Sequence, residues 1–290
     1  MNRRKFLGML AALTPGGEVL AGVPPRKWSR EAALDFLVRR QSPDGAWRSE
    51  VYGMFRGGEA LTPLVLRALH RERPRAAAAG FSWVSRQPPE SWALFPVHNA
   101  CWLLELAAEH PCLAGLRILL RERLQELQLG SGSGWLRSSR HFGGWSYASI
   151  PPTQVKEGEI AAMQQPNLSA TVMAVAGLRA AGLPIRDEAF QEASAFIRSC
   201  QNFQTGSSRF DDGGFFQMPD DLMRNKAGKA GVDESGRMRF RSYLAATADG
   251  LRGLLLTGAG LGDPAVRAAL CWLRACDGQT DVPDLRIYSA

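Results

Sequence analysis

Glu31-Ala-Ala-Leu-Asp-Phe-Leu-Val-Arg-Arg-Gln-Ser-Pro-Asp-Gly-Ala-Trp47 is the stretch that decides how this chain is expected to fold. Apolar residues three and four apart predict an amphipathic helix, and Gln41 follows it ahead of a Pro-Asp-Gly turn and a Trp. A second copy reads Ala193-Ser-Ala-Phe-Ile-Arg-Ser-Cys-Gln-Asn202 and continues, after an insertion, with Asp211-Asp-Gly-Gly-Phe-Phe216. A helix that ends in Gln before a Gly-aromatic loop, and that recurs, indicates stacked helical hairpins.

The composition favours a helical protein. The chain has 290 residues, of which 45% are hydrophobic, so a sizeable core is expected. Ala, Leu and Arg dominate the long segments and β-branched runs are scarce, which favours helix. The 30 glycines and 17 prolines cluster between those segments and are expected in loops. We therefore predict an all-α fold with a single domain over residues 22–290.

Apolar spacing predicts nine helices of two kinds. Five are amphipathic and rich in Arg and Glu, which suits an outer layer with one face in water. Four are smoother and richer in Ala, Leu and Thr, which suits an inner layer packed on both sides. Asp263-Pro264 supplies a cap and a first-turn proline for the last helix. The expected outer helices are 30–40, 74–86, 112–128, 187–200 and 263–276, and the expected inner helices are 59–70, 94–109, 167–182 and 240–257.

Two long loops, 130–166 and 201–239, stretch the hairpin spacing. Loops of this length within a compact domain are usually functional or disordered. Their Gly-aromatic parts are expected to be ordered, whereas the charged part Lys226–Gly236 is expected to be mobile.

The net charge of +7 gives no indication of a nucleic-acid partner. The basic residues are scattered and interrupted by acidic ones, and no basic stripe alternates with aromatic residues. No apolar segment reaches the roughly 20 residues that span a bilayer. We therefore expect neither nucleic-acid binding nor a transmembrane segment.

The N-terminus resembles a twin-arginine export signal. It reads Met1-Asn-Arg-Arg-Lys-Phe-Leu-Gly-Met-Leu-Ala-Ala-Leu-Thr-Pro-Gly-Gly-Glu-Val-Leu-Ala21, with twin arginines before a short apolar run. Val19 and Ala21 suit a small-residue cleavage site. We expect residues 1–21 to direct export to the periplasm or cell envelope. If the segment instead stays on the protein as a basic helix, the protein is cytoplasmic.

The five cysteines form neither a metal-binding nor a disulfide pattern. No CxxC pair is present, and Cys271 and Cys276 fall on different faces of a helix. Cys101 and Cys200 lie among apolar helical residues and are expected in the core. We predict no structural zinc and no essential disulfide.

Further segments resemble those of a known family. The segment Gln41–Trp47 resembles the QW repeat of squalene–hopene cyclases and the related prenyltransferase/squalene-oxidase repeat. This resemblance, which covers roughly residues 30–275, implies an α/α toroid, in which inner helices surround a central cavity and outer helices surround them. The segments that are similar to the family's inner-helix pattern are Gly143-Gly-Trp-Ser-Tyr147, Asn167-Leu-Ser-Ala-Thr-Val-Met-Ala-Val-Ala-Gly-Leu-Arg-Ala-Ala-Gly182 and Ser242-Tyr-Leu-Ala-Ala-Thr-Ala-Asp-Gly-Leu251.

The resemblance also implies structural roles for the repeat residues. The Gln is expected to hydrogen-bond N–H groups at the start of the next helix, and the Trp to pack on the turn. Gln41 with Trp47 and Gln201 with Phe215 would fill these roles. The family's full ring has six hairpins, whereas this sequence shows four and the first helix of a fifth. Such an incomplete ring would expose an apolar groove and an open edge suited to a homodimer.

The residues that carry the family's chemistry are missing. The cyclases protonate their substrate with Asp-x-Asp-Asp, whereas Asp211-Asp212 is only a pair, in a loop where turn carboxylates are ordinary. The prenyltransferases hold zinc with Asp, Cys and His, but their late His is replaced here by Tyr243, and Cys101 has no Asp two residues before it. We therefore expect no metal and no cofactor.

Several other residues are candidates for a functional lining. Asp249, in an apolar inner helix, is expected to be either a perturbed acid or an ordinary capping or ion-paired carboxylate. The histidines and aromatic residues are expected either to line the cavity or to belong to the core. The candidate catalytic residues are Asp249, Asp212 and Asp211, and the candidate ligand-binding residues are His98, Trp102, His141, Trp145, Tyr147 and Tyr243.

Three functions are compatible with these residues. The first is a toroid that binds an apolar, isoprenoid-like ligand or a protein partner without the usual cyclase acid. The second is a cyclase-like enzyme that uses Asp249 or Asp212 as its acid. The third is a carbohydrate-active enzyme, which needs two carboxylates about 5–10 Å apart in one cleft. We rank the binding function first, since a fold does not by itself establish an activity.

Overall fold

The computed structural model describes residues 29–93, 96–152, 160–161, 164–203, 209–219, 221–234 and 236–276. Within these ranges the regular structure is mainly helical, with nine α-helices and one two-stranded sheet. The expected all-α class is confirmed at this level. The export signal expected at 1–21 lies outside the described residues.

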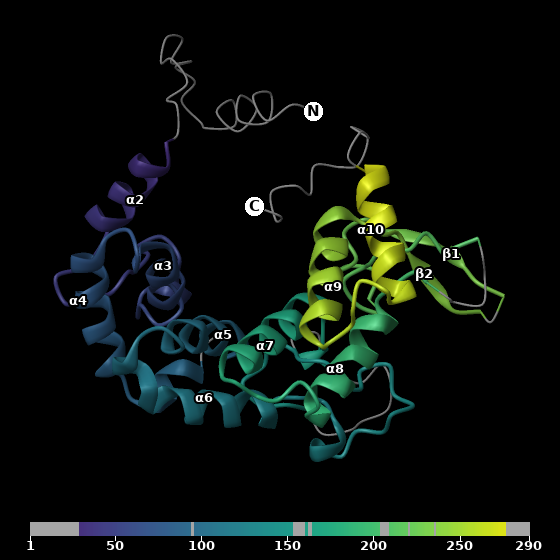
Figure 1. The fold of residues 1–290 in the computed structure, drawn as a ribbon, viewed down its shortest axis with the longest axis horizontal. Coiled ribbons are helices and arrows are strands. Elements are labelled where there is room, and N and C mark those ends of the chain that lie inside the picture. Colours follow the sequence, from purple (N-terminus) through teal and green to yellow (C-terminus); the bar gives the residue numbers. More distant parts are fainter. Residues whose placement is uncertain are drawn as a thin grey trace, which may run out of the picture.

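The α-helices alternate along the chain between two layers (Figure 1). Each inner helix packs on the next inner helix, and each outer helix packs on an inner neighbour. In Figure 1 the hairpins follow one another along an open curve from α2 to α10. The outer helices are α2 (Arg30–Arg39), α4 (Pro74–Ser85), α6 (Ala114–Glu126), α8 (Glu188–Ser199) and α10 (Pro264–Cys276), and the inner helices are α3 (Thr62–Leu69), α5 (Pro96–Ala107), α7 (Leu168–Ala180) and α9 (Leu244–Leu256).

Burial follows the two kinds of helix that the sequence predicts. Most residues of α7 are buried, whereas α6 buries only Leu120 and Leu124. The hydrophobic core has two main parts, and α7 contributes to both, with Leu178 in the first and Val172 in the second. The central inner helix therefore joins the two halves of the core. Cys101 and Cys200 are buried, as expected.

The helix boundaries agree with the predicted ones within a few residues, except at the start of α9. The sequence predicts helix from residue 240, but Met238–Phe240 forms strand β2, which pairs antiparallel with β1 (Lys229–Val232). The strands follow a turn in which Gly236 adopts φ +78° and its N–H donates to the Asp233 carbonyl. This hairpin occupies the segment that was expected to be mobile. Four short 3₁₀ helices also form, at Gly53–Phe55, Pro89–Ala93, Pro111–Leu113 and Ser131–Ser133.

Caps fix several helix starts. The Asp263 carboxylate accepts a hydrogen bond from the Ala265 N–H, as the Asp-Pro pair predicts. Ser29, Asn167 and Asp187 cap α2, α7 and α8 in the same way. None of the helices in the described ranges combines the length and the apolar character that crossing a membrane requires.

Candidate functional site

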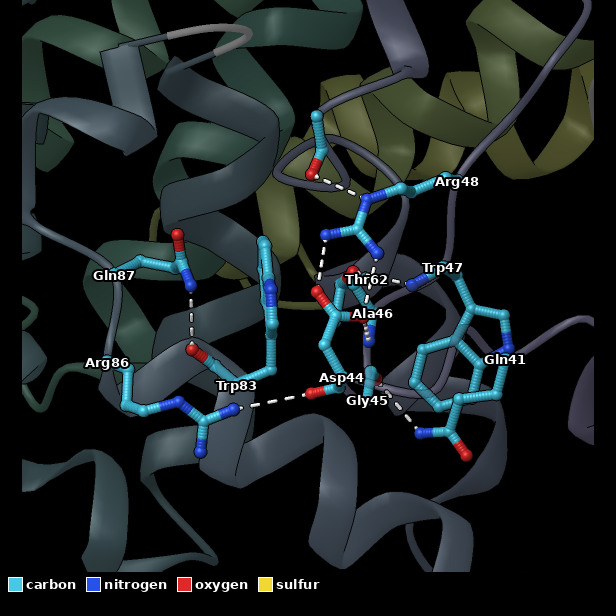
Figure 2. A network of polar contacts seen from close by, with 11 residues as sticks. Gln41, Asp44, Gly45, Ala46, Trp47, Arg48, Thr62, Trp83, Arg86 and Gln87 are labelled. Atoms are coloured by element: carbon cyan, nitrogen blue, oxygen red, sulfur yellow. Dashed lines mark hydrogen bonds and ion pairs between the residues drawn. The ribbon is translucent and has the colours of Figure 1, made fainter.

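Three loops lead from an outer helix to an inner helix with one shared pattern of hydrogen bonds. In each, a Gln side-chain amide donates to the carbonyl of a loop glycine and to a carbonyl in the first turn of the next outer helix. Figure 2 shows the first loop, where Gln41 Nε2 lies 2.9 Å from the Gly45 oxygen. The Gln–glycine–helix sets are Gln41 with Gly45 and Ala76, Gln128 with Gly143 and Ala189, and Gln201 with Gly213 and Ala265.

The direction of these hydrogen bonds corrects the expectation from the sequence. The Gln was expected to bond N–H groups of the next helix, but its amide donates to carbonyls instead. In α10 the reason is visible, because Pro264 has no N–H and the Asp263 carboxylate already accepts from Ala265. A carbonyl oxygen has two lone pairs and can accept a second donor.

The aromatic residue of each loop ties it to the following inner helix. The backbone N–H groups of Trp47, Trp145 and Phe215 each donate over 3.0 Å to a threonine hydroxyl in that helix. Each indole N–H of the two tryptophans also donates over 2.7 Å to the preceding outer helix, at Leu37 or Leu124. The three threonines are Thr62, Thr171 and Thr247. Each loop therefore joins three helices by buried or partly buried hydrogen bonds.

Glycine is required at one position of each loop. Gly45, Gly143 and Gly213 have φ between +83° and +102°. A Cβ on Gly213 would lie 2.7 Å from the Ala268 carbonyl oxygen, and one on Gly143 would overlap the carbonyl oxygen of Glu192. Only glycine combines this conformation with so close an approach.

The loop that begins at Gln128 was not predicted as a repeat, because a long insertion separates its Gln from its aromatic residue. The structure also places Trp145 differently from the other candidate ligand-binding residues. Its side chain is fully buried, and its indole N–H bonds the Leu124 carbonyl. Trp145 therefore belongs to the core of this loop.

Five of the predicted candidates come together near the N-terminal halves of α5, α7 and α9. The His98 ring stacks on the Tyr147 ring at a centroid distance of 5.2 Å, and the Trp102 ring lies 5.7 Å from His98. Charge on Asp249 acts on both Tyr147 and Tyr243. We call His98, Trp102, Tyr147, Tyr243 and Asp249 the inner cluster.

Two amide side chains, which the sequence did not single out, support this cluster. The Tyr243 hydroxyl donates to Gln217 Oε1 over 3.1 Å, and Gln217 Nε2 donates to Asn167 Oδ1 over 3.1 Å. The same Asn167 oxygen caps α7 by accepting from the Ala170 N–H. The start of α9 is thus linked to the start of α7 through neutral side chains.

Burial sets the protonation of the inner cluster. It lowers the pKa of His98 to about 4, so the imidazole is neutral at pH 7. Burial also raises the pKa of Tyr147 and of Tyr243, and both remain protonated. The pKa of Asp249 is raised by burial as well, against an opposing effect of Arg252. The cluster is therefore an aromatic surface with one carboxyl group whose charge is disfavoured.

The other candidates lie elsewhere. Asp211 and Asp212 belong to the third loop, where Asp212 Oδ1 accepts from the Gly214 N–H at 2.9 Å and from the Ser242 hydroxyl at 2.7 Å. This is the turn role that was considered for the pair. His141 is buried in the insertion loop, with its ring 6.0 Å from that of Trp135. Neither site joins the inner cluster.

A second group of polar residues surrounds a pocket of about 490 Å³ near the C-terminal ends of α3, α5 and α7. Its lining is charged, with ion pairs of 2.5–2.7 Å between Arg and Glu side chains. The pairs are Arg30 with Glu72, Arg67 with Glu105, and Arg71 with Glu109. The sequence did not indicate this pocket, because its residues come from three helix ends that are distant along the chain.

Searches of protein-family models, curated proteins and solved structures found no match to this chain.

Proposed function

We propose that this chain is a binding protein of the α/α-toroid type, related to the squalene–hopene cyclase and prenyltransferase repeat proteins, and that its inner cluster takes an apolar, isoprenoid-like ligand. Support for the architecture comes from the alternating layers and the three loops with one bonding pattern. The observation that carries the function is the convergence of five residues from α5, α9 and the intervening loop.

The chemistry of the inner cluster suits a ligand with a large apolar body. His98 is neutral, and with Trp102 and Tyr147 it offers ring faces that attract hydrocarbon or cationic groups. Asp249 and Tyr243 add a carboxyl and a hydroxyl group that can orient one polar end. A few placed polar groups in an apolar lining are typical of small-molecule sites. A protein partner with an apolar segment competes for the same face.

A cyclase-like enzyme is the second candidate, and one observation favours it. Burial raises the pKa of Asp249, and an acid that protonates an alkene must hold its proton near neutral pH. Asp249→Asn would then abolish conversion of a squalene-like substrate while leaving binding intact. Unchanged turnover in that variant would exclude Asp249 as the acid.

The carbohydrate-active alternative fits the charged pocket poorly. Its carboxylates Glu72 and Glu109 are each paired with an arginine, and this pairing lowers their pKa. A glycosidase acid needs the opposite shift, because it must be protonated to assist the leaving group. The geometry therefore supports the binding function better.

Solvent extraction of the purified protein, followed by mass spectrometry, tests the proposal. We expect an apolar compound in the wild type, or uptake of added squalene, and at least about tenfold less in Trp102→Ala, since an aromatic anchor contributes about 2 kcal/mol or more. Tyr52→Ala, which changes an exposed aromatic residue in another loop, is the matched control. Absence of bound or added ligand in the wild type, or equal retention by Trp102→Ala, would overturn the proposal.

A further inference from the structure

Three side chains with metal-binding atoms meet beside the charged pocket. The ligand atoms of His70, Glu109 and His110 all lie within 4.8 Å of one another. His70 Nδ1 lies 3.0 Å from His110 Nε2 and 3.9 Å from Glu109 Oε2. His70 follows the last residue of α3, and Glu109 and His110 follow α5, so two consecutive inner helices end at the same place.

The types and spacing of these atoms fit one divalent ion. Zinc takes two imidazole nitrogens and a carboxylate oxygen at about 2.0–2.2 Å, and keeps a fourth position for water or another ligand. Tetrahedral ligands at this bond length lie roughly 3.3 Å apart, a value between the two distances observed. We propose that His70, Glu109 and His110 form a binding site for a zinc-type divalent transition-metal ion, separate from the inner cluster and independent of the function proposed for it.

The surroundings favour a cation at this position. The site lies at the C-terminal ends of α3 and α5, where backbone carbonyls give the helix its partial negative charge. The His110 ring packs against Phe81 at a centroid distance of 4.2 Å, which restricts its orientation. His70 and Glu109 both line the pocket, so a fourth ligand can reach the ion from there.

Two present interactions must change when a metal binds. The 3.0 Å contact between the imidazoles is a hydrogen bond, so one ring carries its proton at the shared position. A metal needs lone pairs on both of these nitrogens, which places each proton on the remote nitrogen of its ring. Arg71 holds both oxygens of Glu109, at 3.2 and 2.6 Å, and must release one of them. Arg71 is therefore a competitor of the metal for Glu109.

This site departs from the expectation that the chain has no metal. That expectation considered cysteine spacing and the prenyltransferase ligand pattern, and neither includes these residues. His70 and His110 are 40 positions apart, so no local motif joins them. They occupy equivalent places at the ends of successive inner helices, and alignment of the hairpins would have revealed this.

Zinc titration of the metal-free full-length protein by calorimetry, with a competing chelator, tests the site. We expect one zinc ion per chain, no response to magnesium, and affinity reduced roughly a hundredfold or more in His70→Gln and in His110→Gln, since even residues that only support ligands cost 10–100-fold. His98→Gln and His141→Gln remove the other two histidines of the chain and should retain full affinity. Arg71→Gln should tighten binding, because it frees Glu109.

Thermal unfolding with and without zinc separates loss of ligands from loss of fold. Zinc should raise the unfolding temperature of the wild type and of His98→Gln, and should not raise that of folded His70→Gln. A wild type that binds no zinc would overturn the proposal, as would equal affinity in His70→Gln, or a loss in His98→Gln as large as that in His70→Gln.

Discussion

At the N-terminal ends of the inner helices, amide and hydroxyl side chains bond to backbone groups, whereas at the C-terminal ends charged side chains bond mainly to one another. Gln128 and Gln201 are buried and each satisfies two carbonyls. The Arg30–Glu72 and Arg71–Glu109 pairs are largely exposed to water. The two ends thus use different physical means to join the same hairpins.

This difference separates stability from adaptability. A buried amide that loses its partner leaves polar groups without water, so the loops are costly to disturb. Exposed ion pairs contribute little, because water and salt screen them and two long side chains must be ordered. The N-terminal ends therefore hold the hairpins together and present a fixed aromatic surface. The C-terminal ends can rearrange their charges when an ion or ligand arrives.

The largest effect is expected at a glycine of the loops. Gly143→Ala would place a Cβ against the carbonyl oxygen of Glu192 on a backbone with φ +83°, so we expect a loss of at least about 3 kcal/mol in unfolding free energy, or failure to fold. Gly132→Ala is the matched control in the same loop, because nothing lies within 4 Å of its added Cβ. Denaturant unfolding measures both, and equal losses would refute this account of the loops.

A smaller loss is expected from removing the amide of a loop. Gln201→Ala deprives two carbonyls of a buried donor, and we expect about 2–3 kcal/mol of destabilisation. Gln87 also follows an outer helix, but it donates only to Trp83 within its own hairpin, so Gln87→Ala should cost about 0.5 kcal/mol. If both variants unfold at the same denaturant concentration, the repeated loops have no special role.

Acidification should weaken the inner cluster through His98. Its pKa is about 4 in the folded protein and about 6.5 unfolded, so the unfolded chain binds the extra proton first. Stability is therefore lost as pH falls from about 6.5 to 4, by about 1–3 kcal/mol. His98→Phe keeps a ring against Tyr147 without titrating. The difference between the two proteins should grow over this pH range, and a constant difference would show that His98 is not buried as described.

The smallest effect is expected among the exposed ion pairs of the pocket. Arg30→Ala removes the partner of Glu72, whose contact with Arg30 is 2.5 Å but exposed to solvent. We expect no measurable change in the unfolding temperature at physiological salt. A marked decrease would mean that the C-terminal ends are held together by their charges, contrary to the comparison made here.

The sequence predicted those features that depend on neighbouring residues. Apolar spacing located nine helices, and the short loop from Gln41 to Trp47 identified the repeat. The loop from Gln128 was missed because an insertion hides it, and the β1–β2 hairpin because its strands are short and mostly exposed.

Contacts between hairpins were harder to predict. Composition and helix position selected all five residues of the inner cluster, but they could not show that Asp211, Asp212, His141 and Trp145 lie elsewhere. The amides that support the cluster, and the meeting of His70 with His110, arise only when separate helix ends pack together. No periodicity along one segment contains that information.

Hydrogen–deuterium exchange of the full-length protein with and without squalene tests most directly whether an apolar ligand binds at the N-terminal ends of the inner helices. We predict slower exchange in peptides from the starts of α5 and α9, which carry His98 and Tyr243, and no change in the peptide from Arg67 to Glu72 beside the charged pocket. Protection confined to the pocket peptide, or none at either end at saturating squalene, would contradict the account.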